Sequence, residues 1–213
     1  MADSVILYQE IRSLSDDYES RLKERISARV LEMESDDRLH HVLYQVLGVT
    51  AREGYDIDVY QNKGRFLYKY AGAFLESAAR LCIEYKHPGA RRIKITNTLG
   101  QRPATFEIDA LLPSGDAFEI KWRDATTDGD HITKEHTRLK VIANAGYRPV
   151  RLMFYYPNRD HAKRIQKTLE TLDAGVGGHY YCGDAAWNYI DKNTGVDLLA
   201  VLNRIALEKT HGQ

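Results

Sequence analysis

The sequence has little of several features that identify common protein classes. It contains two cysteines in 213 residues, Cys82 and Cys182, and they form neither a Cys-x-x-Cys pair nor a zinc-finger spacing. We therefore expect reduced thiols and no disulfide. No apolar run approaches the roughly 20 residues of a membrane span, and the short stretch Val5-Ile-Leu7 is followed directly by polar and charged residues, unlike a signal peptide. These absences predict a cytoplasmic protein with no membrane contact.

A phosphate-binding loop and a net charge are missing as well. The segment Gly175-Val-Gly-Gly178 lacks the Lys-Ser/Thr that completes such a loop. The 30 basic and 30 acidic side chains balance, which argues against a globally basic, nonspecific nucleic-acid binder. The charge is nevertheless uneven: residues 1–37 hold ten acidic and five basic side chains, whereas residues 86–106 and 148–167 are two basic stretches. Such stretches suit contact with a phosphate backbone, or are solvated faces.

The strongest feature that is present is a β-hairpin predicted at residues 105–122. Two runs of alternating apolar residues flank the turn Pro113-Ser-Gly115. If the turn is symmetric about Ser114, Asp109 lies opposite Glu119, and Lys121 shares the face of Glu119. The other face is apolar and consists of Phe106, Ile108, Ala110, Leu112, Phe118, Ile120 and Trp122.

The charged face of this hairpin indicates a cation site. Two carboxylates that oppose each other on a sheet repel, so we expect a cation to neutralise Asp109 and Glu119. Hard cations such as Mg²⁺ bind carboxylate and carbonyl oxygens and leave positions for water and substrate phosphate. The hairpin therefore suggests phosphate chemistry. The alternative is a half-solvated surface sheet, which shows the same alternation.

The motif on the hairpin resembles that of a known nuclease superfamily. Ile108-Asp109, nine intervening residues and Glu119-Ile-Lys121 resemble the bipartite motif of the PD-(D/E)xK nucleases, and especially the type II restriction endonucleases. The chain departs from the motif at Ile108, where the name has proline, but this position is not a metal ligand in the family. The resemblance implies a catalytic Lys121 and Mg²⁺ bound by Asp109, Glu119 and the backbone carbonyl of Ile120.

The order of the predicted elements also agrees with that superfamily. A helix at 69–84 and a strand at 92–98 precede the hairpin, and a helix at 130–145, closed by Gly146, and a strand at 149–156 follow it. The resemblance implies an α/β, restriction-endonuclease-like αβββαβ core with a central mixed sheet and extra N- and C-terminal helices. In the family the first helix often supplies an active-site Glu. Glu76, among small residues, is the candidate here, and Glu84 is the alternative.

We expect a single domain, residues 1–213, with three parts. These are an N-terminal helical appendage (1–62), a catalytic core (63–158), and C-terminal helices with a short strand (159–213). In the appendage, apolar residues at helical spacing predict a helix with a bend at Ser15-Asp-Asp17, and Ser35-Asp-Asp-Arg38 is expected to cap a second helix ending at Gly48. The appendage either packs on the core or forms a homodimer, which would read a palindromic site.

The resemblance implies a type II restriction endonuclease that cleaves double-stranded DNA at a specific site with Mg²⁺ and leaves 5′-phosphate ends. In a restriction–modification system, a cognate methyltransferase would protect the host's own sites. Candidate DNA contacts lie in the first basic stretch, the loop after the hairpin and the next helix: Arg91, Arg92, Lys94, Arg102, Arg123, Asp124, Lys134 and Arg138. A repair nuclease or junction resolvase of the same fold, and a non-catalytic DNA-binding or structural protein, remain alternatives.

Overall fold

The computed structural model describes residues 2–123 and 129–211 and has the predicted α/β fold. Its residues group into two compact units. One unit is Arg12–Phe74, and the other combines Met1–Ile11 with Leu75–Gln213. The central sheet belongs to the second unit. None of the helices in the described part of the chain combines the length and apolar character needed to cross a bilayer.

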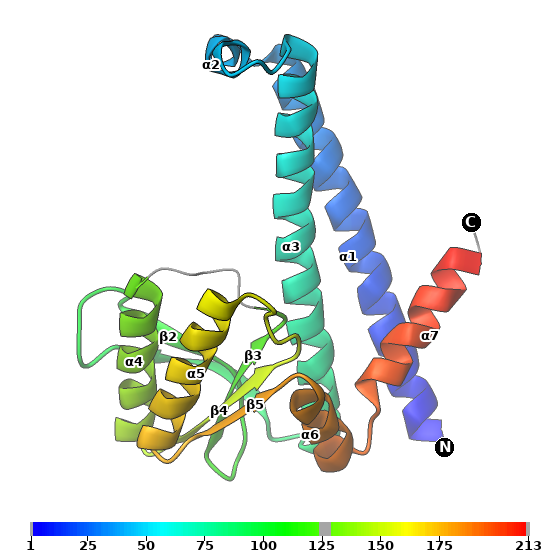
Figure 1. Cartoon of the computed structure of the whole chain (residues 1–213). Coiled ribbons are helices and arrows are strands. Elements are labelled where there is room, and N and C mark those ends of the chain that lie inside the picture. The colour runs from blue at the N-terminus through cyan, green and yellow to red at the C-terminus, as the bar shows by residue number, and fades with distance from the viewer. Residues whose placement is uncertain (1, 124–128, 212–213) are drawn as a thin grey trace. The chain divides into compact units, whose positions relative to one another are not determined.

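The unit Arg12–Phe74 is helical and contains most of α1 (Ala2–Ser35), α2 (His41–Val46) and the first part of α3 (Ala51–Lys86) (Figure 1). Aromatic side chains pair α1 with α3. The ring centroid of Tyr18 lies 6.3 Å from that of Tyr70 and 5.8 Å from that of Phe74, and the guanidinium of Arg25 stands over Phe66 at 5.3 Å. Tyr18, one of the apolar residues at helical spacing in α1, therefore lies at the contact between these helices.

The bend expected at Ser15-Asp-Asp17 is wrong, because α1 is continuous through these residues. Two ion pairs at i,i+4 spacing keep the aspartates in the helix. Arg12 Nη1 lies 2.5 Å from Asp16 Oδ1, and Arg21 Nη1 lies 3.1 Å from Asp17 Oδ2. Pairs of this kind stabilise a helix, which offsets the preference of aspartate for turns.

The second helix also differs from the expectation. The Ser35 hydroxyl donates to the Glu32 carbonyl at 2.9 Å, so it ends α1 and does not cap α2, which has only six residues. The start of α3 was not predicted; there the Glu53 amide donates to Thr50 Oγ1 at 3.3 Å and the Thr50 amide donates to Glu53 Oε2 at 2.9 Å. This is a capping box. The boundary predicted between residues 62 and 63 lies inside α3, and the division into three parts stays a prediction.

The five strands lie in the order in which they occur in the chain: β1 (Arg91–Thr96), β2 (Thr105–Leu111), β3 (Asp116–Lys121), β4 (Arg148–Met153) and β5 (His179–Cys182). The pairs β1–β2 and β2–β3 are antiparallel, and β3–β4 and β4–β5 are parallel, so the sheet is mixed as expected. Ala110 pairs with Phe118, and Leu111 with Ala117. These are the partners predicted from symmetry about Ser114, and they confirm the register of the hairpin.

Helices cover the sheet on both faces. The helices after the hairpin are α4 (Gly129–Asn144), α5 (Asp160–Gly175), α6 (Asp184–Thr194) and α7 (Leu198–His211). Helices α4 and α5 pack side by side (Figure 1), and Ile142 of α4 packs with Leu111 and Ala117. The ring of Tyr189 on α6 lies 5.9 Å from that of Phe118. Successive residues of a strand point to opposite faces, so α4 and α6 lie on opposite sides of the sheet.

Candidate active site

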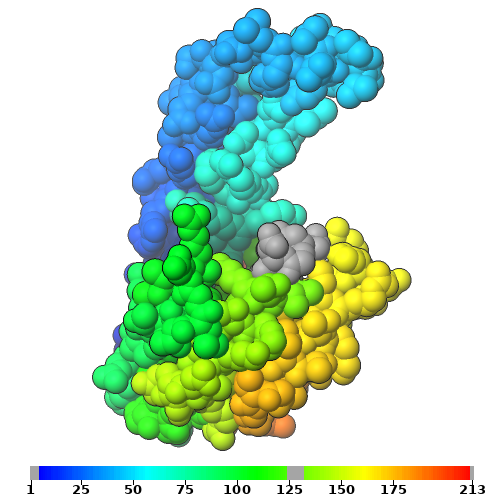
Figure 2. Space-filling view, turned by 90° about the vertical axis from the view of Figure 1, so that its left-hand side faces the viewer, coloured from blue at the N-terminus to red at the C-terminus, as the bar shows by residue number. Residues whose placement is uncertain are grey.

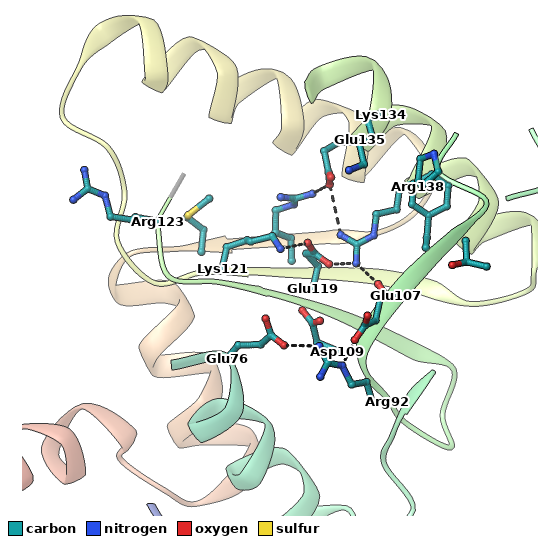
Figure 3. A pocket seen from close by; sticks show the side chains of 15 residues that line it. Glu76, Arg92, Glu107, Asp109, Glu119, Lys121, Arg123, Lys134, Glu135 and Arg138 are labelled. Carbon is teal, nitrogen blue, oxygen red and sulfur yellow. Dashed lines mark hydrogen bonds and ion pairs between the residues drawn. The ribbon is translucent and has the colours of Figure 1, made fainter. Parts of the chain in front are cut away.

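A cavity of about 580 Å³ lies where α3, the sheet and α4 meet (Figure 3). Helix α3 supplies Glu76, β2 supplies Asp109, and β3 supplies Glu119 and Lys121. Strand alternation gives Glu119 and Lys121 one face, as the sequence analysis predicted, and β2 is held beside them by the hairpin register. The structure thus brings all four candidate catalytic side chains to one cavity.

Asp109 is a buried carboxylate with a backbone partner. It is 5% exposed, and its Oδ2 accepts a hydrogen bond of 2.7 Å from the backbone amide of Ile120. The bond joins β2 to β3 at the position next to the last paired residues of the hairpin. Figure 3 shows the Asp109 carboxylate between those of Glu76 and Glu119. Its orientation is therefore fixed, with the carboxylate beside two other acids.

Glu119 takes cationic partners instead. Its Oε1 lies 2.5 Å from Lys121 Nζ, and its Oε2 forms an ion pair with Arg138 Nη2 of α4. The same Arg138 nitrogen donates to the carbonyl oxygen of Glu107 at 2.6 Å. Because Glu119 is 8% exposed and Arg138 is 5% exposed, their pairing is little screened by solvent. Each oxygen of Glu119 is thus neutralised by a side chain of the protein.

Behind Glu119, buried charges continue away from the cavity. Arg138 Nη1 lies 3.7 Å from Glu135 Oε2, which also pairs with Arg151 Nη2 of β4. Arg151 Nε in turn lies 3.7 Å from Asp173 Oδ2 on α5. We call Glu119, Arg138, Glu135, Arg151 and Asp173 the buried charge chain. It links three elements behind β3, so the position of Glu119 depends on α4 and β4.

Burial shifts two groups of this chain. It lowers the pKa of Arg138 to about 10, assisted by the positive charge of Arg151. It raises the pKa of Asp173 to about 7, because the nearby Arg151 only partly offsets the loss of solvent. Neither oxygen of Asp173 has a hydrogen-bond partner among the described residues. Arg138 remains charged at neutral pH, whereas Asp173 titrates close to it.

The opposite wall of the cavity is more open. Arg92 on β1 forms an ion pair with Glu107 through Nε, and its Nη2 lies 3.1 Å from Glu76 Oε1. Burial, and then the charge of Asp109, raise the pKa of Glu76 above its usual range, although Arg92 and Lys121 oppose the shift. The protein's cations therefore do not fully compensate Glu76 beside Asp109.

This donor set fits a hard divalent cation. Glu76, Asp109 and Glu119 supply carboxylate oxygens, and the cavity is lined by no cysteine or histidine among its described residues. Oxygen ligands of this kind suit Mg²⁺ and Mn²⁺ rather than soft metals. Burial is the main cause of the raised pKa of Glu76 and the charge of Asp109 is the next, and a cation between the two carboxylates would offset this second cause.

Some of the candidate DNA contacts line the cavity, and others do not. Arg92, Arg123 and Lys134 line the cavity and are exposed. Three further candidates are exposed but do not belong to its described lining: Arg91, Lys94 and Arg102. Arg102 lies in the loop between β1 and β2, which forms a projecting ridge, coloured green, in Figure 2. Asp124 lies outside the described residues.

Two expectations for arginines need correction. Arg138 was expected to contact DNA, but it is buried against Glu119. In the basic stretch 148–167, Arg151 is 2% exposed and paired with Glu135, and Arg148 pairs with Asp116 at 2.5 Å. The stretch therefore presents less positive charge to solvent than its sequence suggests, because these two arginines meet carboxylates that are distant along the chain.

Neither Glu135 nor the burial of Arg138 was predicted from the sequence. A signal was present, since residues 135, 138, 139 and 142 lie at helical spacing and are all buried on one face of α4. Two charged residues on an otherwise apolar helix face predict a buried ion pair. Identifying their partners required the fold, because Glu119 and Arg151 lie on different strands.

Comparison with protein families identifies a family to which the chain is similar. A family model described as ApaLI-like restriction endonuclease matches residues 1–207 of the chain. No curated protein and no solved structure matches it.

Proposed function

Because the chain belongs to the ApaLI-like restriction endonuclease family, we propose that it is a type II restriction endonuclease which cleaves double-stranded DNA at a specific, palindromic sequence. The family identifies a nuclease with a DNA substrate. The observation that carries the finer proposal is the meeting of Glu76, Asp109, Glu119 and Lys121 in one cavity. Their elements of origin, α3, β2 and β3, are those that the nuclease resemblance implies.

In this proposal, Asp109, Glu119 and the backbone carbonyl of Ile120 hold Mg²⁺. When bound, the metal ion would lower the pKa of a water molecule and stabilise negative charge on the phosphate. The residues Asp109 and Glu119 are 5% and 8% exposed, so solvent screens the charges of their carboxylates only weakly. Resemblance to the family supports products with 5′-phosphate ends.

Lys121 is the proposed catalytic cation. Its ammonium lies 2.5 Å from Glu119 and its side chain is 39% exposed, so it reaches both the carboxylate and a phosphate in the cavity. There it would orient the attacking water and offset the developing negative charge. Arg138 approaches Glu119 from the buried side, and in this role it holds the carboxylate in place.

Phosphate contacts are assigned to the exposed cations around the cavity. Arg92, Arg123 and Lys134 line it, and we propose that they neutralise backbone phosphates next to the cleaved bond. Arg91, Lys94 and Arg102 extend this positive surface along β1 and the β1–β2 loop. No residue is assigned to base recognition.

We also propose that the enzyme acts as a homodimer, since a twofold protein reads a twofold DNA sequence. Five neighbouring apolar side chains in and around α2 are strongly exposed and offer a surface that a second copy would cover: Leu39, Val42, Leu43, Val46 and Leu47. Light scattering of the wild-type protein and of Leu43→Glu tests this part separately. A monomeric wild-type protein would contradict it.

Plasmid cleavage tests the central proposal. The purified protein is incubated with a mixed-sequence plasmid, with Mg²⁺ or with EDTA, beside Asp109→Asn and Lys121→Met. The matched control is Asp116→Asn, which alters a second buried carboxylate of the same hairpin, away from the cavity. We expect discrete bands with Mg²⁺ from the wild type and the control only, and sequencing of their ends gives the site and the end chemistry.

Other outcomes would select another function. Cleavage of branched or damaged DNA but not of plain duplex would replace the proposal by a repair nuclease or junction resolvase. Binding of DNA without any cleavage, unaffected by Mg²⁺, would indicate a non-catalytic protein. Discrete bands that persist in Asp109→Asn would show that the cavity is not the site of the reaction.

A further inference from the structure

A second cluster of metal-binding groups lies in the helical unit Arg12–Phe74. His40 Nε2 and His41 Nε2 each lie 3.2 Å from the same oxygen, Oδ2 of Asp58. The other oxygen of Asp58 accepts a hydrogen bond of 3.0 Å from the Tyr44 hydroxyl. The two imidazole nitrogens and the carboxylate oxygen all lie within 4.8 Å of one another.

The two nitrogen–oxygen separations agree with those of zinc ligands. Tetrahedral ligands about 2.0–2.1 Å from Zn²⁺ lie about 3.3–3.4 Å from each other, and both nitrogen–oxygen distances here are 3.2 Å. Two imidazoles and one carboxylate suit zinc and related transition metals, in contrast to the all-oxygen donors beside Asp109. The hydrogen bond from Tyr44 to Asp58 is the kind of contact that orients a ligating carboxylate.

The site is open to solvent on one side. His41 is 4% exposed and His40 remains accessible, so a metal ion would reach the site from the solvent side.

Helix α2 has few contacts of its own that would hold it in place. Helix α2 has six residues, and His41 is its only buried residue. Its apolar side chains Val42, Leu43 and Val46 are more than half exposed, so hydrophobic burial does little to hold it. A helix this short is not stable by itself. The contacts of His40, His41 and Tyr44 with Asp58 join α2 to α3.

We propose that His40, His41 and Asp58 bind one Zn²⁺, with solvent as the fourth ligand, and that this ion fastens α2 to α3. The ion is structural, and it is independent of the Mg²⁺ proposed for the cavity. This zinc ion would have three protein ligands, whereas a closed structural site has four. We therefore expect that a chelator removes it and that added Zn²⁺ restores it.

Zinc content of the full-length protein tests this inference. After dialysis against Zn²⁺ and removal of free metal, we expect about one zinc per chain in the wild type, measured by atomic emission. The content should fall to background in His41→Gln and in Asp58→Asn. The control His179→Gln removes an exposed histidine elsewhere and should keep its zinc, and Asp109→Asn should keep it too.

Each other result overturns the proposal. Absence of zinc from the wild type, retention of zinc in Asp58→Asn, or loss of zinc in Asp109→Asn would each place the metal elsewhere or nowhere. If a variant fails to fold, X-ray absorption of the zinc-loaded wild type decides alone. It should show two imidazoles and oxygen ligands at about 2.0–2.1 Å, and a shell without imidazole would refute the site.

Discussion

The β2–β3 hairpin carries buried carboxylates at both ends, and the two ends differ in how these are neutralised. Near the turn, Asp116 accepts a hydrogen bond of 3.0 Å from Ser114 and pairs with Arg148 at 2.5 Å. At the other end, Asp109 and Glu119 share their space with Glu76. One acid with its own arginine stabilises a turn, whereas a group of acids with incomplete compensation makes a site that a metal ion would complete. Comparable residues thus serve structure at one end and, in our proposal, chemistry at the other.

Exchange of one carboxylate for its amide gives the largest expected contrast between the ends. Asp109→Asn should reduce DNA cleavage below detection, because it removes a proposed metal ligand while keeping the acceptor for the Ile120 amide. Asp116→Asn should keep near-wild-type cleavage and lose only some thermal stability. Plasmid cleavage and thermal unfolding measure both. Equal losses of activity in the two variants would contradict the assignment of a structural role to Asp116 and a catalytic role to Asp109.

Lys121→Met should have the next largest effect. It keeps much of the side-chain volume and removes the ammonium 2.5 Å from Glu119. We expect cleavage to fall about 10²–10³-fold, the usual loss when one group that stabilises transition-state charge is removed. DNA binding, measured by fluorescence anisotropy with Ca²⁺ in place of Mg²⁺, should change little. A loss of binding as large as the loss of cleavage would assign Lys121 to affinity instead.

Two arginines allow a matched comparison of the ends. Arg138→Gln removes the buried partner of Glu119, and we expect cleavage to fall about 10–100-fold, as for other groups that orient a metal ligand. The loss should shrink at high Mg²⁺ concentration, since the ion then helps to orient Glu119. Arg148→Gln removes the partner of Asp116 and should leave cleavage unchanged. A loss of cleavage in Arg138→Gln that does not depend on Mg²⁺ concentration would contradict the role of Arg138 in orienting Glu119.

Glu76→Gln should stabilise the metal-free protein and weaken its response to Mg²⁺. The raised pKa of Glu76 means that its ionised form destabilises the metal-free fold at pH values above that pKa. The variant should therefore melt at a higher temperature than the wild type at pH 8 without metal, and this difference should vanish as the pH falls through the pKa. Mg²⁺ should raise the melting temperature more in the wild type. An identical Mg²⁺ response in both proteins would remove Glu76 from the site.

The far end of the buried charge chain should affect stability alone. Asp173 has a pKa of about 7 in the folded protein, against an ordinary value of 3.8. The folded state therefore binds a proton more tightly than the unfolded state, and stability should rise as the pH falls from above 7 toward 4. Asp173→Asn should flatten this pH dependence and keep cleavage near the wild-type level. An unchanged pH profile of unfolding would show that Asp173 is not the titrating group.

The sequence predicted those features that depend on local pattern. The turn at Pro113-Ser-Gly115 determined the hairpin register, and strand alternation then placed Glu119 and Lys121 on one face. The end of α4 before Gly146, which has a φ of +83°, was predicted for a similar reason, because glycine adopts this conformation without strain.

Features that depend on contacts between distant residues were not predictable in the same way. The burial of Arg138 and Arg151 depends on Glu119 and Glu135, which lie on other elements. The wrong prediction at Ser15-Asp-Asp17 had another cause, since Arg12 and Arg21 lie one helical turn from Asp16 and Asp17 and their ion pairs offset the preference of aspartate for turns.

The two counterions of Glu119 have a consequence for how the enzyme acquires its metal. In the protein alone, the Glu119 carboxylate has Lys121 on one oxygen and Arg138 on the other, so a metal ion that binds it has to displace a cation of the protein. In the proposed function, a divalent ion would enter by exchange, which would gain less free energy than binding to a carboxylate without counterions. Lys121, the more exposed of the two cations, would be the one released, and its ammonium would then be available to the phosphate. Binding of the metal ion and release of the Lys121 ammonium from Glu119 would then occur in the same step.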